Sequence, residues 1–387
     1  MSVQIVHAAD LHLDRNFRIA NLTRRDRRKE DLKSNFERIA DYVIENEPDL
    51  FLLAGDVFDR INPGNSAREL LVRKLKEVSV AGVKVFVIGG NHDVPKLRRG
   101  PGTLAIDVLE AAGIARVFGQ SDRFVSATLK IDGKPVTVAG RSFFAEREEM
   151  NPFGDSLSPK GRHNIVLVHG SLQAGDVMPN DLSFIRQHPF SAQDIPPEVS
   201  YVALGHYHNP FVRVRDQTWI VNPGSIERLT WADADDNKGF VWAEITQEGV
   251  EVEQIKLPTR PMRALELTLG KDDGRDLTEL VVSYLREDPD PDAIARLSLN
   301  GLIRPEQHRS LQVREVYQEA SDLFFHFTLD QTRLEVEGFG RVFLSRVDSP
   351  REAFEKRLER LIEERPEEKD FLTRVKDLGL EYLRGGR

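Results

Sequence analysis

The sequence has 387 residues, and its 63 acidic and 54 basic side chains give a net charge of −9. This length predicts two domains, or one large domain with appendages. A mean hydropathy of −0.40, and no apolar run near the roughly 18 residues that a membrane span needs, exclude an integral membrane protein. We expect no signal peptide, and the lack of cysteine excludes disulfides and thiolate metal sites. The acidic balance argues against a protein that holds nucleic acid by net charge alone.

Short β-rich runs alternate with helix-like segments through the first 260 residues. The runs span residues 3–9, 50–54, 83–88, 136–139, 165–168, 201–204, 219–222, 240–245 and 250–255. Between the early runs, apolar residues recur at helical spacing, as at Leu32, Phe36, Ile39 and Val43. Strands that alternate with helices predict an α/β fold with a parallel or mixed sheet covered on both faces.

Two prolines, Pro258 and Pro261, interrupt this pattern and predict a domain boundary. Beyond them, β-rich runs at 264–269, 294–299 and 323–329, with a helix that Asp276 could cap, predict a small α+β module. The last residues predict two short amphipathic helices, which either pack on their own domain or dock a partner. The first of them starts at a capping-box pattern at residues 349–352. The predicted domains are 1–258, 262–345 and 349–387.

Five short polar motifs lie at or just after the ends of predicted strands. They are Asp10-Leu11-His12, Gly55-Asp56-Val57-Phe58-Asp59, Gly90-Asn91-His92-Asp93, His169-Gly170 and Gly205-His206-Tyr207-His208. Each motif alone is also typical of an ordinary turn. Because open α/β folds bind ligands at the carboxyl ends of their strands, all five together predict one shared site.

The motifs supply carboxylate, amide and imidazole groups, which are metal ligands. The candidate ligands are Asp10, His12, Asp56, Asn91, His169, His206 and His208. This set suits Mn²⁺, Fe²⁺ or Zn²⁺ better than Ca²⁺ or a structural zinc. Seven donors are too many for one ion and fit two ions that share a carboxylate. Such a pair can clamp the oxygens of a phosphoryl group during in-line displacement.

The series of motifs resembles that of the calcineurin-like metallophosphoesterases. Within that superfamily, the chain looks like the SbcD-type DNA repair nucleases, bacterial counterparts of the eukaryotic double-strand-break nuclease. The resemblance is carried by the segments HAADLHLDRNF, LLAGDVFD, IGGNHD, VALGHYHNP and VNPGSIER. It covers residues 1–228 by motif and the rest by layout only. It implies a two-sheet αββα sandwich, a small α+β capping domain that faces DNA, and C-terminal helices.

The resemblance also implies how the ligands divide between two ions. Asp10, His12, Asp56 and His208 would hold one ion, and Asp56, Asn91, His169 and His206 the other. Asp56 would therefore bridge the two. The implied metal is most consistent with Mn²⁺, with Fe²⁺, Zn²⁺ or Mg²⁺ as alternatives.

Other residues near the motifs also gain roles from the resemblance. His92 matches the family's catalytic histidine, which assists the leaving oxygen or stabilises the pentacoordinate phosphorus, and Asp93 is expected to orient its ring. Asp59 stands where some relatives have a histidine, so its role is open. The segment 222–225 is either a loop near the metals or a tight turn. Arg98 and Arg99 are candidate DNA-binding residues or part of a solvated face.

The implied reaction is metal-assisted hydrolysis of phosphodiester bonds at DNA ends, by an exonuclease with endonuclease action as a further option, in double-strand-break repair. The alternatives are a small-molecule or cyclic-nucleotide phosphodiesterase, a phosphoprotein phosphatase and a non-catalytic scaffold. The phosphatase pattern has Asp-Arg-Gly and Asn-His-Glu, whereas this chain has Ile61 and Asp93 at the last positions. A scaffold is disfavoured because every ligand position is retained.

The implied partners are DNA ends and an SMC-like coiled-coil ATPase of the SbcC type, docked through the C-terminal helices. The resemblance further implies a homodimer through helices near residues 67–78, and a cytoplasmic, nucleoid-associated location. Two divalent ions beside Asp10 and Asp56 would leave the cleft at about +2, so an acidic chain can still attract phosphate there.

Overall fold

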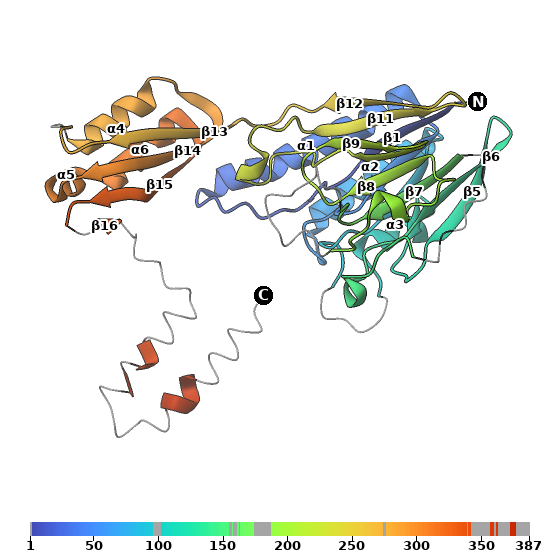
Figure 1. Cartoon of the computed structure of the whole chain (residues 1–387), viewed down its shortest axis with the longest axis horizontal. Helices are drawn as coiled ribbons and strands as arrows, with labels where there is room; N and C mark the ends of the chain where they lie inside the picture. Colours follow the sequence, from blue (N-terminus) through green and yellow to red (C-terminus); the bar gives the residue numbers. More distant parts are fainter. Residues whose placement is uncertain are drawn as a thin grey trace. The chain divides into compact units, whose positions relative to one another are not determined.

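The structure is a computed structural model with two compact units, Met1–Met262 and Arg263–Arg387 (Figure 1). It describes residues 2–95, 102–154, 157, 161, 163–173, 187–273, 276–338, 340–341, 357–359, 361–362 and 372–376. Among the helices of these residues, none combines the length and apolar character needed to cross a bilayer.

The first unit contains two six-stranded sheets. The first sheet has the order β12-β11-β1-β2-β3-β4. Its strands are β1 (Val3–Ala8), β2 (Leu50–Ala54), β3 (Lys84–Ile88), β4 (Arg116–Phe118), β11 (Gly239–Ile245) and β12 (Val250–Lys256). The strands β1 to β4 are parallel, whereas β11 and β12 are antiparallel to their neighbours. The carboxyl ends of β1, β2 and β3 therefore meet at one edge.

The second sheet has the order β5-β6-β7-β8-β10-β9. Its strands are β5 (Val125–Ile131), β6 (Lys134–Gly140), β7 (His163–His169), β8 (Tyr201–Gly205), β9 (Phe211–Arg215) and β10 (Thr218–Asn222). The four central strands are parallel, and β5 and β9 are antiparallel edge strands. The sequence pattern did not predict these two edge strands, because exposed polar residues interrupt their apolar runs.

Apolar side chains from both sheets interdigitate to form a central core. The inner faces contribute residues such as Leu52 and Ile88 from the first sheet, and Ile165 and Leu167 from the second. All four are fully buried, and burying such a side chain contributes about 1.5–3 kcal/mol. The strand ends of both sheets are thereby fixed next to each other.

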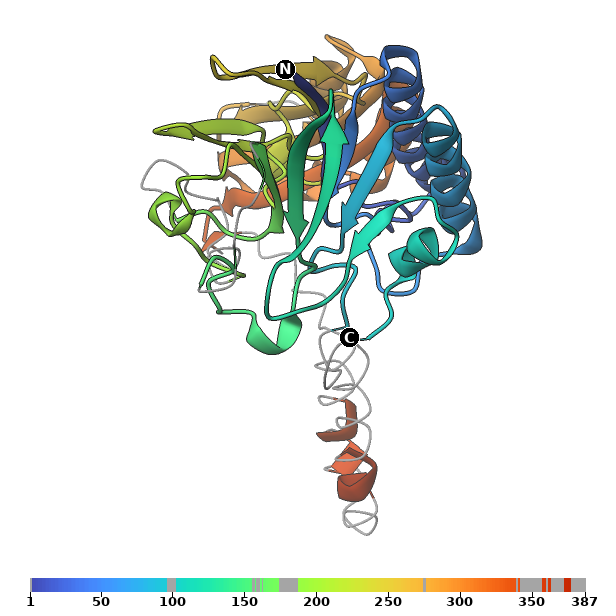
Figure 2. The same ribbon diagram turned by 90° about the vertical axis from the view of Figure 1, so that its right-hand side faces the viewer.

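Three helices cover the outer face of the first sheet: α1 (Leu22–Asn46), α2 (Asn65–Val80) and α3 (Val108–Ala111). Figure 2 shows α1 and α2 side by side on that face. The predicted helical stripe of α1, Leu32, Phe36, Ile39 and Val43, is fully buried against the sheet. Among the described residues, the outer face of the second sheet is covered mainly by loops and one-turn helices such as η4 (Ala192–Asp194). The predicted two-sheet α/β architecture is confirmed.

The second unit is a four-stranded sheet with helices on one face. The sheet has the order β13-β14-β15-β16, with strands β13 (Met262–Leu269), β14 (Asp290–Ile303), β15 (Phe324–Val336) and β16 (Gly340–Arg341). The helices are α4 (Leu277–Arg286), α5 (Pro305–Ser310) and α6 (Val313–Leu323). Asp276 caps α4 as expected, since its side chain accepts the N–H of Thr278.

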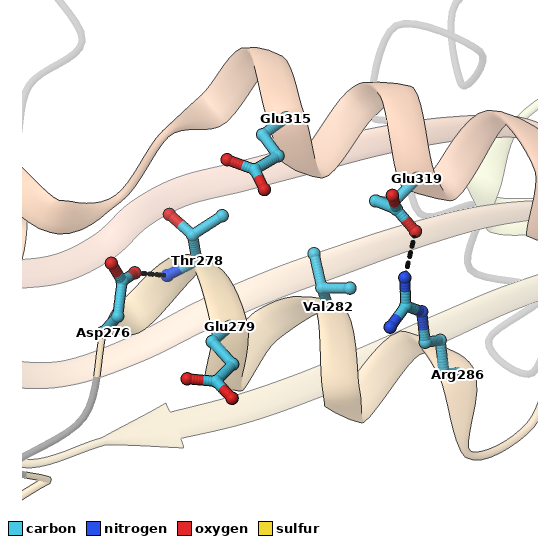
Figure 3. Close-up of a pocket in the computed structure, with 7 residues that line it drawn as sticks. All are labelled: Asp276, Thr278, Glu279, Val282, Arg286, Glu315 and Glu319. Carbon is cyan, nitrogen blue, oxygen red and sulfur yellow. Dashed lines mark hydrogen bonds and ion pairs between the residues drawn. The ribbon is translucent and has the colours of Figure 1, made fainter.

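A groove of about 240 Å³ lies between α4 and α6 (Figure 3). Its lining residues are Asp276, Thr278, Glu279, Val282, Arg286, Glu315 and Glu319. Arg286 pairs with Glu319, so the groove keeps an excess of carboxylates. The helical face of the second unit is therefore acidic at this point.

Most of the predicted C-terminal helices, including the capping-box pattern at residues 349–352, lie outside the described residues. The described pieces, 357–359, 361–362 and 372–376, are helical. An ion pair joins two of them, with Lys376 Nζ 2.6 Å from Glu359 Oε1.

Candidate metal centre

The loops that follow β1 and β2 are joined by backbone hydrogen bonds. The N–H of Asp10 donates to the carbonyl of Gly55 at 3.0 Å, and the N–H of His12 donates to that of Asp56 at 2.9 Å. Because β1 and β2 are adjacent parallel strands, these bonds extend their pairing beyond the sheet edge. The two carboxylates are thus brought to the same place.

Five of the seven predicted ligands form overlapping groups whose donor atoms lie within 4.8 Å of one another. The groups are Asp10 with His12 and His208, Asp10 with Asp56 and His169, and His12 with Asp56 and His92. Asp10, His12, Asp56 and His169 are almost fully buried. Buried carboxylates beside converging imidazoles are costly without a compensating cation, so this donor set fits divalent metal ions.

The imidazoles of His12 and His208 face each other through their Nε2 atoms, which are 3.2 Å apart. On its other side, His12 Nδ1 lies 3.1 Å from Asp59 Oδ1, so a proton on Nδ1 leaves the Nε2 lone pair free for a metal. Burial lowers the pKa of His12 to about 4, against the opposing effect of Asp59, and so keeps the ring neutral. This arrangement suits two nitrogen ligands of one ion.

Asp56 lies at the centre of the donor groups. Its Oδ2 is 3.6 Å from His12 Nε2 and 3.5 Å from His169 Nε2, while its Oδ1 accepts the N–H of His92 at 2.9 Å. Burial raises the pKa of Asp56, yet the charge and hydrogen bond of His169 hold it well below its usual value. One carboxylate thus lies between ligands predicted for different ions, as a bridging group must.

The other two predicted ligands lie next to His169. Asn91 Oδ1 is 3.0 Å from His169 Nε2, and the centroid of the His206 ring is 5.2 Å from that of His169. The N–H of His206 also donates to both carboxylate oxygens of Asp10, at 3.0 and 3.2 Å. Asn91 and His206 are thus close to the carboxylates, although His206 belongs to none of the three donor groups.

Several candidate ligands have backbone angles that are rare for residues other than glycine. The φ angles are 51° for Asp10, 43° for His12, 48° for Asp56 and 108° for His206. Such conformations cost on the order of 1–3 kcal/mol each and persist where surrounding contacts hold them. Here the backbone hydrogen bonds between the loops supply those contacts.

His92 is the most exposed imidazole of the cluster, with 39% of its side chain accessible. Its Nδ1 lies 3.1 Å from the carbonyl oxygen of Asp59, and its ring packs edge-on against that of His12 at 4.8 Å. A proton on Nδ1 leaves Nε2 able to interact with a substrate. The predicted catalytic histidine therefore lies beside the donor cluster and reaches solvent.

Asp93 differs from the sequence-based expectation, because its carboxylate is used by the backbone. It accepts the N–H groups of Val57, Phe58 and Gly90 at 2.9–3.0 Å. The oxygen that fixes the His92 ring belongs instead to Asp59. The Gly-Asn-His-Asp turn leaves Asp93 pointing back under the loop after β2, so its contacts make it a brace for that loop.

Asp59, whose role the sequence left open, contacts both histidines. Its carboxylate faces His12 Nδ1 and also accepts Arg15 Nη1 at 2.8 Å, while its carbonyl faces His92. Its carboxylate position, three residues after Asp56, was the available signal. The structure thus makes Asp59 the residue that orients two imidazoles of the site.

The segment 222–225 holds the loop that carries His206 and His208. Asn222 Nδ2 donates to the carbonyls of Tyr207 and Asn209 at 2.7 and 2.8 Å, and the N–H of Ser225 donates to that of His208 at 2.9 Å. Of the two interpretations of this segment, the contacts favour the loop near the candidate ligands. Arg98 and Arg99, the predicted DNA-binding residues, lie outside the described residues.

Two glycines are required by close approach of the loops. Gly55 has φ +93°, a left-handed conformation that favours glycine. At Gly90, an added Cβ would lie 2.2 Å from Asp56 Oδ1 and 2.4 Å from its nitrogen. A side chain at position 90 would therefore displace the central carboxylate.

We predict that Gly90→Ala lowers hydrolysis of a generic phosphodiester such as bis(p-nitrophenyl) phosphate on the order of 10²-fold, because Asp56 must shift. The matched control is Gly119→Ala, where an added Cβ meets no atom within 4 Å. Steady-state rates with added Mn²⁺ would measure the effect. Equal rates for the two variants would contradict the packing argument.

We also predict that metal affinity rises with pH. In the metal-free protein, burial lowers the pKa of His169, but the charge of Asp56 and its hydrogen bond raise it to a net value of about 9. An ion that binds Nε2 must displace this proton, so affinity should increase up to about tenfold per pH unit until pH 9. Below pH 6 the dependence should steepen, since burial raises the pKa of Asp10 to about 6.

Calorimetric titration with Mn²⁺ between pH 6 and 9, in buffers of different ionisation enthalpy, would test this and count the protons released. An affinity that stays constant from pH 7 to 9, with no proton release, would rule out a protonated His169.

Comparison with known proteins gives the family. The model of the calcineurin-like phosphoesterase family matches residues 3–210, more than half of the chain. The chain belongs to this family. The predicted resemblance and the predicted enzyme class, a phosphoesterase, are therefore confirmed. All seven candidate ligands and His92 lie within the matched residues.

Several curated relatives are DNA repair proteins. The DNA double-strand break repair protein Mre11 of Methanopyrus kandleri is 29% identical over 247 residues, which cover 61% of this chain and 51% of that protein. Mre11 of Thermoplasma acidophilum is 24% identical over 85% of this chain and 90% of its own length. The SbcD component of the nuclease SbcCD of Staphylococcus epidermidis is 23% identical over 69% and 72%, respectively. The chain thus spans about half the length of the first relative.

Proposed function

We propose that this protein is a metal-dependent nuclease that hydrolyses phosphodiester bonds at DNA ends, as an exonuclease with endonuclease action as a further activity, in double-strand-break repair. The observation that carries the proposal is the cluster of Asp10, His12, Asp56, His169 and His208 within 4.8 Å groups at the strand ends. Membership of a phosphoesterase family and the names of the Mre11 and SbcCD relatives support DNA as the substrate.

In this proposal the seven candidate ligands hold two divalent ions, most consistent with Mn²⁺. When bound, such ions supply positive charge to the phosphate oxygens and lower the pKa of a coordinated water. Asp56, between His12 and His169, holds the two ligand sets together. Asp59 keeps the His12 ring in the tautomer that leaves Nε2 for the metal.

His92 is the proposed catalytic residue. With Nδ1 held by the carbonyl of Asp59, the ring can donate a hydrogen bond or proton from Nε2 to the departing oxygen when it is protonated. Its 39% exposure suits contact with a large substrate that stays partly in solvent. Asp93 supports the same turn through three backbone N–H groups.

The second unit is proposed to be a capping domain that faces DNA. Its acidic groove between α4 and α6 would repel phosphate, so we assign contact with DNA to the opposite sheet face. On β14, Arg296, Ser298 and Asn300 alternate with the buried Leu297 and Leu299 and so point away from the helices. This face combines a guanidinium group with small polar side chains, which suits contact with phosphates.

Arg98 and Arg99 remain proposed DNA contacts. Charge reversal at both positions should weaken DNA binding and reduce its dependence on salt. An unaltered salt slope would exclude contact there.

An SMC-like ATPase of the SbcC type is the proposed protein partner, docked on the residues after Ser349. We further propose a homodimer through α2, and action in the cytoplasm on nucleoid DNA. Co-purification of the ATPase with full-length protein, but not with a chain that ends at Ser349, is the expected result. Undiminished binding by the shortened chain would refute this docking site.

The alternative function is hydrolysis of small or cyclic phosphodiesters, which the same donor cluster could perform. Comparison of kcat/KM on end-labelled duplex DNA, a cyclic nucleotide and bis(p-nitrophenyl) phosphate tests the proposal. We expect DNA to be the preferred substrate by orders of magnitude. Preference for a small diester would favour the alternative.

A further inference from the structure

A buried ion pair lies directly behind the loop that carries His208. Lys238 precedes β11, and Asp233 ends the one-turn helix η5 (Trp231–Asp233). Both residues are only 1% exposed, and Lys238 Nζ lies 3.3 Å from Asp233 Oδ1. Burying two charges is costly even when they are paired, so such a pair calls for a specific role.

Both members of the pair contact His208. Lys238 Nζ donates to the carbonyl oxygen of His208 at 2.8 Å, and Asp233 Oδ2 lies 3.7 Å from His208 Nδ1. The same carbonyl accepts the N–H of Ser225 at 2.9 Å. The backbone of His208 is thus fixed by two donors, and its ring has a carboxylate on the side opposite His12.

The pair is itself firmly held. Asp233 Oδ2 accepts the N–H groups of Leu229 and Thr230 at 3.0 and 2.7 Å, and Lys238 Nζ also reaches Asp236 Oδ2 at 3.1 Å. Because these partners come from a closed turn, the carboxylate can move little. A rigid carboxylate beside an imidazole fixes both its tautomer and its orientation.

The three imidazoles of the donor groups share this arrangement. The Nδ1 atom of His12 faces Asp59, that of His169 faces the carbonyl of Ala54 at 3.0 Å, and that of His208 faces Asp233. In each case an oxygen on the Nδ1 side leaves Nε2 for the shared centre. His208 is the one of the three whose oxygen partner requires a buried lysine to balance it.

We propose that Asp233 and Lys238 are positioning residues for the metal ligand His208: the lysine fixes the backbone of His208, and the carboxylate orients its ring so that Nε2 meets the ion. The inference rests on the metal site of the proposed function. It assigns to residues beyond the five motifs a part in binding one of the two ions.

Metal binding without DNA tests the inference. The variants are Lys238→Met, which removes the donor and the charge, and Asp233→Asn, which keeps an oxygen for the N–H groups of Leu229 and Thr230 but loses the charge. The double variant Asp233→Asn/Lys238→Met leaves neither charge without its partner. The matched control is Lys74→Met, a lysine with two carboxylate partners, Asp41 and Glu77, on α1 and α2.

Titration of each full-length protein with Mn²⁺, followed by the electron paramagnetic resonance signal of free Mn²⁺, gives the two affinities. We expect the affinity for one ion to fall about 10–100-fold in all three variants, while the other ion and the Lys74→Met control keep wild-type affinity. A turn-closing role alone would leave Asp233→Asn like wild type.

Wild-type affinity for both ions in the double variant would overturn the inference. Equal loss of both ions, with a lower unfolding temperature of the metal-free protein, would also overturn it, since that result indicates collapse of the loop. The test is separate from that of the nuclease proposal. If the wild type binds two ions but cleaves no DNA, the nuclease proposal fails and the positioning role can still hold.

Discussion

Replacement of Asp56 by asparagine is expected to lower phosphodiester hydrolysis on the order of 10³-fold or more, because the carboxylate that lies between the two ligand sets loses its charge. Its Oδ2 is 3.6 Å from His12 and 3.5 Å from His169, so both predicted ions lose a shared anionic ligand. Loss of several kcal/mol of charge stabilisation corresponds to a change of this size. Rates and Mn²⁺ affinity should fall together.

The substitution is nearly isosteric, and the asparagine oxygen can still accept the N–H of His92. The matched control is Asp49→Asn, because Asp49 also accepts a backbone N–H, from Gln4, but lies at the start of β2. The control should retain wild-type activity and metal affinity. If Asp56→Asn kept its affinity for Mn²⁺, the bridging assignment would be wrong.

Replacement of His92 by alanine should lower DNA cleavage about 10²–10⁴-fold while metal affinity changes little. The reason is that the Nδ1 side of His92 is engaged by the carbonyl of Asp59, which leaves the ring for the substrate and not for a metal. Single-turnover cleavage of end-labelled DNA and Mn²⁺ titration of the same sample would measure both effects.

His92 also belongs to one donor group, with His12 and Asp56, so the two measurements separate two roles. Loss of an ion together with activity would make His92 a metal ligand. A control at His308, a histidine on α5 in the second unit, should leave both quantities unchanged.

The strand ends and the ligands upon them could be predicted from the sequence because both signals are local. Each apolar run predicts a strand, and a polar residue that follows it must lie at the sheet edge. The run at 50–54 has the bounds of β2, and Asp56 is two residues beyond its end. The edge strands β5 and β9 were missed, since each has only one weakly apolar face.

Contacts between residues far apart in the chain could not be predicted. Asp93 was expected to orient its neighbour His92, but the turn directs its carboxylate to the backbone of Val57 and Phe58. The oxygen that replaces it comes from Asp59, 33 residues earlier. Likewise, the contact of Lys238 with His208 depends on the packing of β11 and no local pattern indicates it.

The proposal that the cluster at the strand ends is a metal-dependent nuclease site for DNA has one decisive test. It is cleavage of end-labelled duplex and hairpin DNA by metal-stripped protein, before and after addition of Mn²⁺, with Asp56→Asn and His92→Ala beside the wild type. We expect cleavage by the wild type only when metal is present, and almost none by either variant. Cleavage without metal, or equal cleavage by the wild type and both variants, would show that the cluster is not such a site.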